Sequence, residues 1–196
     1  MLTIPSVKNT PSLPGFLDLP SYDQIVVNEE SYSIKHINNE IRNIIDSRNS
    51  NCSGIYIHAS NSASLRAFDD DQGLLSIHEL KKREILVESG EQTHPDFRNV
   101  SEYEHNVVYL TKFSEIGINP EAGTYMSYNV DDTRYPVLYV IEDTDNKVTM
   151  ENSSNYTILN VRPEQIRGLL VPENKIQETR DRLPEFYRDI IISPLN

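Results

Sequence analysis

The chain has 196 residues with 18 basic and 30 acidic side chains, a net charge of −12, and this length suits one domain with an appended arm. The acidic balance disfavours general duplex binding, and the single cysteine, Cys52, excludes an internal disulfide and a multi-cysteine metal site. No stretch approaches the roughly 18 apolar residues of a membrane helix, and no signal-peptide pattern opens the chain, so we expect no membrane span and a protein that is cytoplasmic or secreted without a cleaved signal.

The N-terminal third is predicted to contain an arm and a helix. Residues 1–33 include prolines at positions 5, 11, 14 and 20, which remove backbone donors and favour an extended, proline-rich arm. Residues 34–196 are expected to form one domain that opens with an amphipathic helix over 34–48. The apolar face of this helix would consist of Ile34, Ile37, Ile41, Ile44 and Ile45.

A change of pattern follows the helix. The run IYIHAS over residues 55–60 is β-prone at its start and ends in His-Ala-Ser. A helical turn or two comes next, with Asn61 or Ser62 as its N-cap. Gly73 is expected to take the positive φ that closes a helix.

The second half of the chain is predicted to be rich in strands. The β-prone runs are Asn106–Phe113, Tyr135–Glu142, Lys147–Glu151, Tyr156–Val161 and Ile166–Val171. Residues 143–146, Asp-Thr-Asp-Asn, indicate a hairpin turn. Residues 173–188 indicate a closing helix broken by Pro184. Because helices come early and strands late, without βαβ alternation, we expect an α+β fold with a mainly antiparallel sheet.

Several familiar site motifs are missing from the sequence. Nucleotide-binding glycine loops, HExxH and EF-hand spacing do not occur. The aspartate run 69–71 has the character of a solvated turn, and the five histidines include no close pair of the kind a zinc site needs, so no metal is expected. Cys52 and His58 are disfavoured as nucleophile and base because their Asn/Ser-rich flank gives no reason for a lowered thiol pKa.

Three segments in order resemble the ADP-ribosyltransferase fold of the poly(ADP-ribose) polymerase branch. They are IYIHAS (55–60), NVVYLTKF (106–113) and NYTILNVRPEQIRGLLVP (155–172), which are similar to that branch's histidine strand, tyrosine strand and closing strand pair. The segment GLLSIHELKKREI (73–85) also resembles DNA-targeting toxins of the DarT type. The resemblance covers residues 54–172 and implies a split, mainly antiparallel sheet with NAD as substrate.

The resemblance also implies roles for residues at the histidine and tyrosine strands. His58 would hydrogen-bond the adenosine ribose, and backbone groups around Ala59 would hold the nicotinamide amide with the Ser60 hydroxyl nearby. Tyr109 would lie beneath the nicotinamide ribose and face His58 across one crevice. From the residues alone, a histidine at a strand end and a tyrosine among Val and Leu also fit ordinary structural positions, so both interpretations stay open.

Further cofactor contacts follow from the same resemblance. Tyr125 or Tyr128 would supply a ring that stacks on nicotinamide, because an aromatic face suits a flat cation. Arg66 or Arg98 would neutralise the pyrophosphate. Loop tyrosines that cover a sheet edge and a solvated loop arginine are the structural alternatives.

The sequence departs from the family at its catalytic glutamate. The expected position falls on Asn155, Tyr156 or Thr157, none of which is acidic. Glu151 and Glu164 are the alternative sources of this carboxylate. Otherwise the enzyme borrows its base from the target, or the site is degenerate.

The resulting hypothesis is an NAD-dependent mono-ADP-ribosyltransferase. Its target would be a macromolecule, with protein favoured over nucleic acid because of the acidic surface. The composition also fits a bacterial effector or toxin. The alternatives are a catalytically degenerate domain of the same fold that acts as an interaction module, and an RNA 2′-phosphotransferase-like enzyme. The sequence gives no indication of the oligomeric state.

Overall fold

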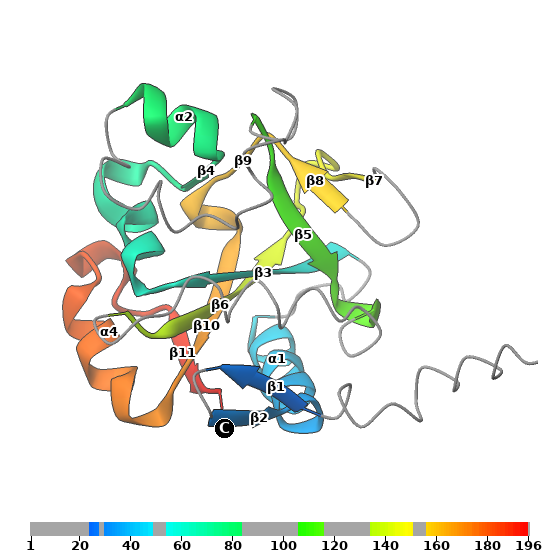
Figure 1. Ribbon diagram of the computed structural model, residues 1–196, viewed down its shortest axis with the longest axis vertical. Helices are drawn as coiled ribbons and strands as arrows, with labels where there is room; N and C mark the ends of the chain where they lie inside the picture. The colour runs from blue at the N-terminus through cyan, green and yellow to red at the C-terminus, as the bar shows by residue number, and fades with distance from the viewer. Residues whose placement is uncertain are drawn as a thin grey trace, which may run out of the picture.

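The computed structural model describes residues 24–27, 30–48, 54–83, 106–115, 134–150 and 156–195. In this part of the chain, the large sheet consists of β3 (Ile55–Asn61), β5 (Val108–Lys112), β6 (Pro136–Glu142), β7 (Thr149–Met150), β8 (Tyr156–Ile158), β10 (Ile166–Val171) and β11 (Ile191–Pro194). The strand order is β11-β10-β6-β3-β5-β8-β7, and only the pair β10–β11 is parallel among these strands (Figure 1). Smaller sheets join β1 (Gln24–Val27) to β2 (Glu30–Ser33) and β4 (Leu74–Leu75) to β9 (Asn160–Val161). The prediction of an α+β fold with a mainly antiparallel sheet is confirmed.

Helices and 3₁₀ turns cover both faces of this sheet. The α-helices of the described ranges are α1 (Ile34–Ser47), α2 (Ile77–Lys82) and α4 (Ile176–Arg182). The 3₁₀ helices are η4 (Ser62–Asp71), η8 (Phe113–Glu115), η9 (Pro163–Gln165), η10 (Glu173–Lys175) and η11 (Glu185–Tyr187). None of the helices in these ranges is long and apolar enough to cross a lipid bilayer.

Helix α1 packs on one face of the sheet, which we call the α1 face. Its N-cap is Ser33, whose hydroxyl accepts a hydrogen bond from the backbone N–H of His36 at 3.4 Å. Of the isoleucines predicted from the periodicity, Ile34 is partly buried and the other four are fully buried against strand residues that include Leu138 and Leu170. At Gly168 an added Cβ would lie 2.8 Å from Cδ1 of Ile44, so the absence of a side chain there lets helix and strand approach closely.

The opposite face carries the larger core, and we call it the η4 face. Leu65 and Phe68 of η4 pack there on Tyr139 of β6 and Leu169 of β10. The side chain of Asn61 caps η4 by accepting a hydrogen bond from the backbone N–H of Ala63 at 2.9 Å, as expected from the sequence. The chain leaves η4 through Gly73, whose φ of +73° is the predicted left-handed conformation.

Two expectations about chain organisation need correction, and one strand was not predicted. Residues 24–27 and 30–33, expected within the extended arm 1–33, pair as the strands β1 and β2, consistent with β-branched residues in the segment QIVV. The break predicted at Pro184 is confirmed, since α4 ends before it, but the segment 173–188 is not otherwise one helix and consists of η10, α4 and η11. Strand β11 was not predicted, since its four residues IISP give no clear alternation.

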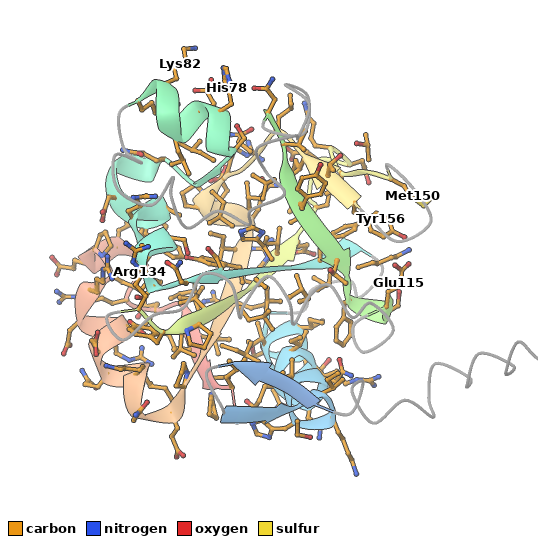
Figure 2. All side chains as sticks on the ribbon, in the orientation of Figure 1. His78, Lys82, Glu115, Arg134, Met150 and Tyr156 are labelled. Carbon is orange, nitrogen blue, oxygen red and sulfur yellow. The ribbon has the colours of Figure 1, made fainter. Side chains whose placement is uncertain are left out.

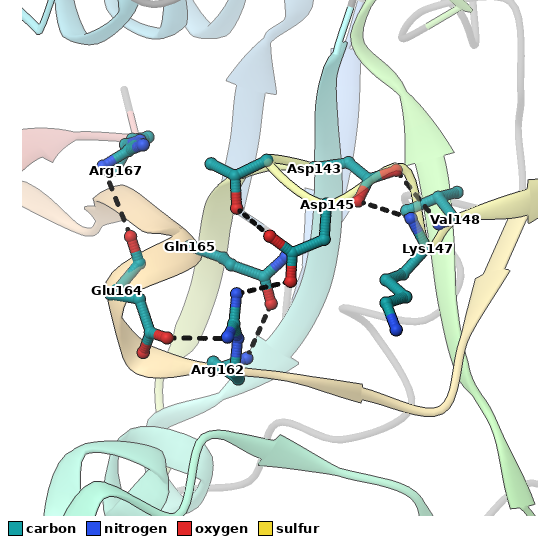
Figure 3. A network of polar contacts seen from close by, with 9 residues as sticks. Asp143, Asp145, Lys147, Val148, Arg162, Glu164, Gln165 and Arg167 are labelled. Atoms are coloured by element: carbon teal, nitrogen blue, oxygen red, sulfur yellow. Dashed lines mark hydrogen bonds and ion pairs between the residues drawn. The ribbon is translucent and has the colours of Figure 1, made fainter.

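A turn is present at residues 143–146 as predicted, but it does not form a hairpin, because β6 pairs with β3 and β10 while β7 pairs with β8. The carboxylate of Asp143 accepts hydrogen bonds from the backbone N–H groups of Lys147 at 2.9 Å and Val148 at 3.0 Å (Figure 3). Asn146 takes a φ of +54°, which asparagine tolerates better than most residues. This turn connects β6 to β7 and so joins a central strand to the edge of the sheet.

Candidate functional site

The central feature of the site is a fork between β3 and β5. Strand β3 pairs with β6 along all of its seven residues, from Ile55↔Glu142 to Asn61↔Pro136. With β5 it pairs only at Tyr56↔Lys112 and Ile57↔Thr111. The sheet therefore divides immediately before His58. We use "the fork" for this point of divergence.

His58 bridges the fork with its side chain. Its Nδ1 atom lies 2.9 Å from the backbone carbonyl oxygen of Tyr109 on β5. A carbonyl oxygen only accepts hydrogen bonds, so Nδ1 carries the proton. Nε2 of the neutral ring is then the atom with a free lone pair, and it can accept a hydrogen bond from a hydroxyl or amide of a ligand.

The surroundings of His58 favour this neutral form. Burial lowers the pKa of the imidazole below its usual 6.5, and the hydrogen bond to the Tyr109 carbonyl opposes this effect only in part. No charged group among the described residues contributes to this pKa shift. At neutral pH the ring therefore presents an uncharged acceptor and is not a cation.

Tyr139 lies beside His58 on the η4 face. The two residues are register partners on β3 and β6, and their ring centroids are 6.0 Å apart. Ser64 donates its hydroxyl proton to the backbone carbonyl of Asn61 at 2.6 Å, so the Tyr139 hydroxyl is the donor to Ser64 at 2.7 Å. Burial strongly raises the pKa of Tyr139. This phenol is therefore a neutral, fixed part of the wall next to the imidazole.

The phenol of Tyr109 does not face His58. Leu110 belongs to the core on the η4 face, together with Tyr139, and side chains alternate along a strand. Tyr109 must then project toward the α1 face, with its register partner Thr157. The expectation that the two rings face each other across one crevice is therefore wrong. Tyr109 meets His58 through its backbone, because a shift of one position along a strand reverses the face.

The next two residues of β3 also project to different faces. Ala59 packs against the hydrophobic cluster under α1, so only its backbone can contribute to a site on the η4 face. Ser60 lies on the η4 face like His58, and it is only partly buried. The structure thus keeps His58 and Ser60 on one face of the sheet.

Arg66 lies near the same wall. It is partly buried on η4, and its pKa is lowered by burial first, while Tyr139 acts in the opposite direction. Arg134 and Arg182 also lower its pKa, and Asp69 raises it. A guanidinium with reduced contact to water and like charges close by is suited to an anionic ligand.

The carboxylate that the family would require is not found beside His58 in the described ranges. Glu164 is 62% exposed on η9 and forms an ion pair with Nε of Arg162 at 3.1 Å (Figure 3). The expected catalytic position includes Tyr156 and Thr157, which are buried strand residues. Glu164 is therefore engaged in a surface ion pair and is a weaker candidate than the sequence suggested.

The carboxylate of Glu115, which we did not predict, contacts Tyr156 at the expected catalytic position. The Tyr156 hydroxyl donates to Oε1 of Glu115 at 2.8 Å, and this hydrogen bond is the main reason why the pKa of Tyr156 rises to about 12. Figure 2 shows the two residues on the same side of the molecule. Tyr56 completes the contact, with its ring centroid 5.4 Å from that of Tyr156. No sequence signal indicated this pair, because Glu115 follows β5 and reaches Tyr156 only through the β5–β8 register.

The remaining predicted site residues lie outside the described residues. They are Arg98, Tyr125, Tyr128 and Glu151. Comparison with known proteins adds no family assignment: neither protein-family models, nor curated proteins, nor solved structures give a match to this chain.

Proposed function

We propose that this domain binds NAD at the fork between β3 and β5 and transfers ADP-ribose to a macromolecular target, with protein as the favoured class of acceptor. The observation that carries the proposal is the neutral imidazole of His58, held by its Nδ1–H bond to Tyr109 at 2.9 Å. A fixed acceptor of this kind is suited to a ribose hydroxyl. The strand order also supports it, because β3 and β5, which carry the histidine and tyrosine motifs, are neighbours in the sheet.

The proposed reaction assigns limited chemistry to the described residues. The bond between nicotinamide and C1′ of the ribose breaks, and its electron pair leaves with nicotinamide. The acceptor then forms a bond to C1′ and loses its proton to a base. His58 and Ser60 would orient the dinucleotide, and Arg66 would offset the charge of its pyrophosphate. The base would be Glu151, Glu115 or a group of the target.

Thermal unfolding with NAD and transfer from labelled NAD test the proposal together. We expect NAD to raise the melting temperature, because a ligand that binds only the native state stabilises it. We also expect label from ³²P-NAD in the protein fraction of a cell lysate. His58→Gln should remove both effects, whereas His78→Gln, an exposed histidine on α2, should leave them unchanged. No shift at millimolar NAD and no label would contradict the proposal.

The same experiment identifies the base. Glu115→Gln and Glu151→Gln are compared with the wild-type chain at saturating NAD. Loss of label with an unchanged NAD-induced shift in melting temperature assigns the carboxylate to the substituted residue. If neither variant loses label, Glu164→Gln separates the last candidate carboxylate of this chain from a base that belongs to the target.

A degenerate interaction domain is the second candidate function. One observation favours it: among the described residues, no carboxylate contributes to the electrostatics of His58, and Glu164 is paired with Arg162. This candidate predicts that NAD leaves no covalent label on any macromolecule. It also predicts that His58→Gln leaves partner binding unchanged. Any other change in activity would come from an effect of the substitution on folding.

A further inference from the structure

We propose that Tyr56, Tyr156, Glu115 and Met150 form a docking surface for an arginine side chain of a partner protein, on the η4 face next to the fork. We call these four residues the tyrosine surface. Docking there requires neither NAD nor a reaction, so it goes beyond the proposed function. The contacts of the four residues define the kind of segment that this end of the sheet fits.

Strand register places the apolar part of the tyrosine surface on one face of the sheet. Tyr56 on β3 and Tyr156 on β8 both pack with the core of the η4 face. Met150 on β7 is the register partner of Tyr156 and is 64% exposed. Figure 2 shows Met150, Tyr156 and Glu115 along one side of the molecule. Tyr56 precedes His58 by two residues on β3, so the tyrosine surface begins about 7 Å along the strand from the fork.

The two tyrosine rings form a corner to which a cation is attracted. Their centroids are 5.4 Å apart and their planes are inclined by 58°, so the rings do not stack face to face. The face of an aromatic ring attracts a positive charge. The chain itself supplies an example, because Nζ of Lys112 lies 5.9 Å from the ring centroid of Tyr156. Tyr156 is buried, whereas Tyr56 and Lys112 are partly exposed, so a guest can reach the corner from solvent.

Glu115 supplies a negative charge beside this corner. Its Oε1 atom accepts the hydrogen bond from the Tyr156 hydroxyl at 2.8 Å, which holds the carboxylate in place. Each carboxylate oxygen can accept more than one hydrogen bond, so Glu115 can bind N–H donors of a guest at the same time. None of the ion pairs between described residues involves Glu115. Within this part of the chain, an ion pair therefore does not neutralise its charge.

A second carboxylate lies diagonally across the ladder from Tyr56. The N–H of Asp143 donates to the carbonyl of Gly54 at 2.8 Å, which extends the β3–β6 ladder. Tyr56 lies two residues after Gly54 on the same face, so Asp143 is its diagonal neighbour. Burial raises the pKa of Tyr56 most, and the charges of Asp143 and then Glu115 raise it further. The Tyr56 hydroxyl thus lies in a negative potential, which favours a cationic guest.

Arginine fits this combination better than lysine does. A guanidinium is planar, so its face stacks on a tyrosine ring while its N–H edge binds a carboxylate. It is more weakly hydrated than an ammonium group, which allows it to replace Nζ of Lys112 at the Tyr156 ring. The exposed side chain of Met150 offers apolar contact to the methylene groups of an arginine stem. A chain of net charge −12 also attracts basic segments at long range, so we expect the partner to be a protein segment rich in arginine.

Calorimetric titration of the full chain with a hexa-arginine peptide, without NAD, tests this surface. We expect the wild-type protein to bind, and Glu115→Gln to weaken binding by about tenfold, because a charge-assisted contact is lost. Glu185→Gln is the matched control, since Glu185 is an exposed glutamate on η11. Tyr156→Phe keeps the ring but releases Glu115, and it should weaken binding by about threefold.

Substitution of Lys112 gives a result of opposite sign. Lys112→Met removes the ammonium group that competes for the Tyr156 ring, so it should tighten binding of the peptide by about threefold. Lys35→Met removes the same charge from an exposed position on α1 and should leave the affinity unchanged. Melting curves of each variant show whether it stays folded.

Four outcomes would overturn the docking surface. The first is failure of the wild-type protein to bind hexa-arginine. Equal weakening by Glu185→Gln, or equal tightening by Lys35→Met, would mean that net charge alone attracts the peptide. Equal affinity for a hexa-lysine peptide would exclude recognition of the guanidinium group.

Thermal unfolding with NAD separates this surface from the proposed function. Peptide binding by a protein whose melting temperature NAD does not raise supports the tyrosine surface and contradicts the proposed function. A shift with NAD in a protein that does not bind the peptide overturns the tyrosine surface and supports the fork as the NAD site. His58→Gln should leave peptide affinity unchanged, because the imidazole belongs to the fork and not to the tyrosine surface.

Discussion

The imidazole of His58 donates from Nδ1 to the backbone carbonyl of Tyr109 over 2.9 Å. This bond connects two parts of one sheet, β11-β10-β6-β3 and β5-β8-β7, at the point where direct pairing of β3 with β5 ends. The side chain therefore satisfies a carbonyl that a continuous ladder would have paired with a backbone N–H. His58 therefore stabilises the fork and also places a neutral hydrogen-bond acceptor there.

Acid should destabilise the protein through His58. Its pKa in the folded state is lowered below 6.5, so below that pH the unfolded chain binds a proton that the native state does not. The stabilisation is present above pH 6.5 and is lost as the pH falls, by up to about 1.4 kcal/mol per pH unit. Urea unfolding at pH 7.5 and 5.5 should show a steeper loss for wild type than for His58→Gln. Equal losses would contradict the assignment.

Tyr139 and Ser64 should be energetically coupled. Tyr139→Phe removes the hydrogen bond to Ser64 and should lower the free energy of unfolding by about 1 kcal/mol. Ser64→Ala also removes the bond to the carbonyl of Asn61, so its cost should be greater. In a double-mutant cycle the double variant should be less destabilised than the sum of the two single variants. Strict additivity would show that the hydroxyl contact contributes nothing.

Local sequence patterns predicted the elements whose stability is local. The isoleucines of α1 appear at helical spacing and are buried together under the sheet. Asn61 caps η4, and Asn146 takes the left-handed conformation in the turn after β6. In each case the residues that decide the structure lie within a few positions of one another, so the local sequence is sufficient to identify them.

Contacts between distant segments could not be predicted in this way. His58 meets Tyr139 and Glu115 meets Tyr156 because of strand order and register, which a single sequence does not specify. The prediction that the Tyr109 ring faces His58 was wrong for the same reason, since a shift of one residue in register reverses the direction of a side chain. Tyr139 belongs to an expected strand, yet nothing in that strand indicated its neighbour on β3.

Substitution of Gly73 should be far more costly than substitution of Gly54. At Gly73 the φ of +73° disfavours any side chain, and an added Cβ would collide with the backbone carbonyl of Val161. At Gly54 the nearest atom to an added Cβ is the carbonyl oxygen of Asp143 at 3.7 Å, an ordinary contact. We expect Gly73→Ala to lose at least about 2 kcal/mol of unfolding free energy, and Gly54→Ala less than about 1 kcal/mol. Chemical denaturation of both variants measures the difference.

The turn between β6 and β7 gives a prediction that separates the contribution of backbone hydrogen bonds from that of a surface ion pair. The Asp143 carboxylate accepts two backbone hydrogen bonds, from Lys147 and Val148, so Asp143→Ala should cost about 1–2 kcal/mol. Asp145 is instead paired with Arg162 across an exposed surface at 2.6 Å (Figure 3). Its removal should cost only a few tenths of a kcal/mol, and less still in high salt, because exposed ion pairs are weakened by solvent and ions. Urea unfolding of both alanine variants at low and high salt measures the two costs. If Asp145→Ala proved the more damaging, the ion pair to Arg162, and not the backbone hydrogen bonds of Asp143, would hold this turn against the segment before β10.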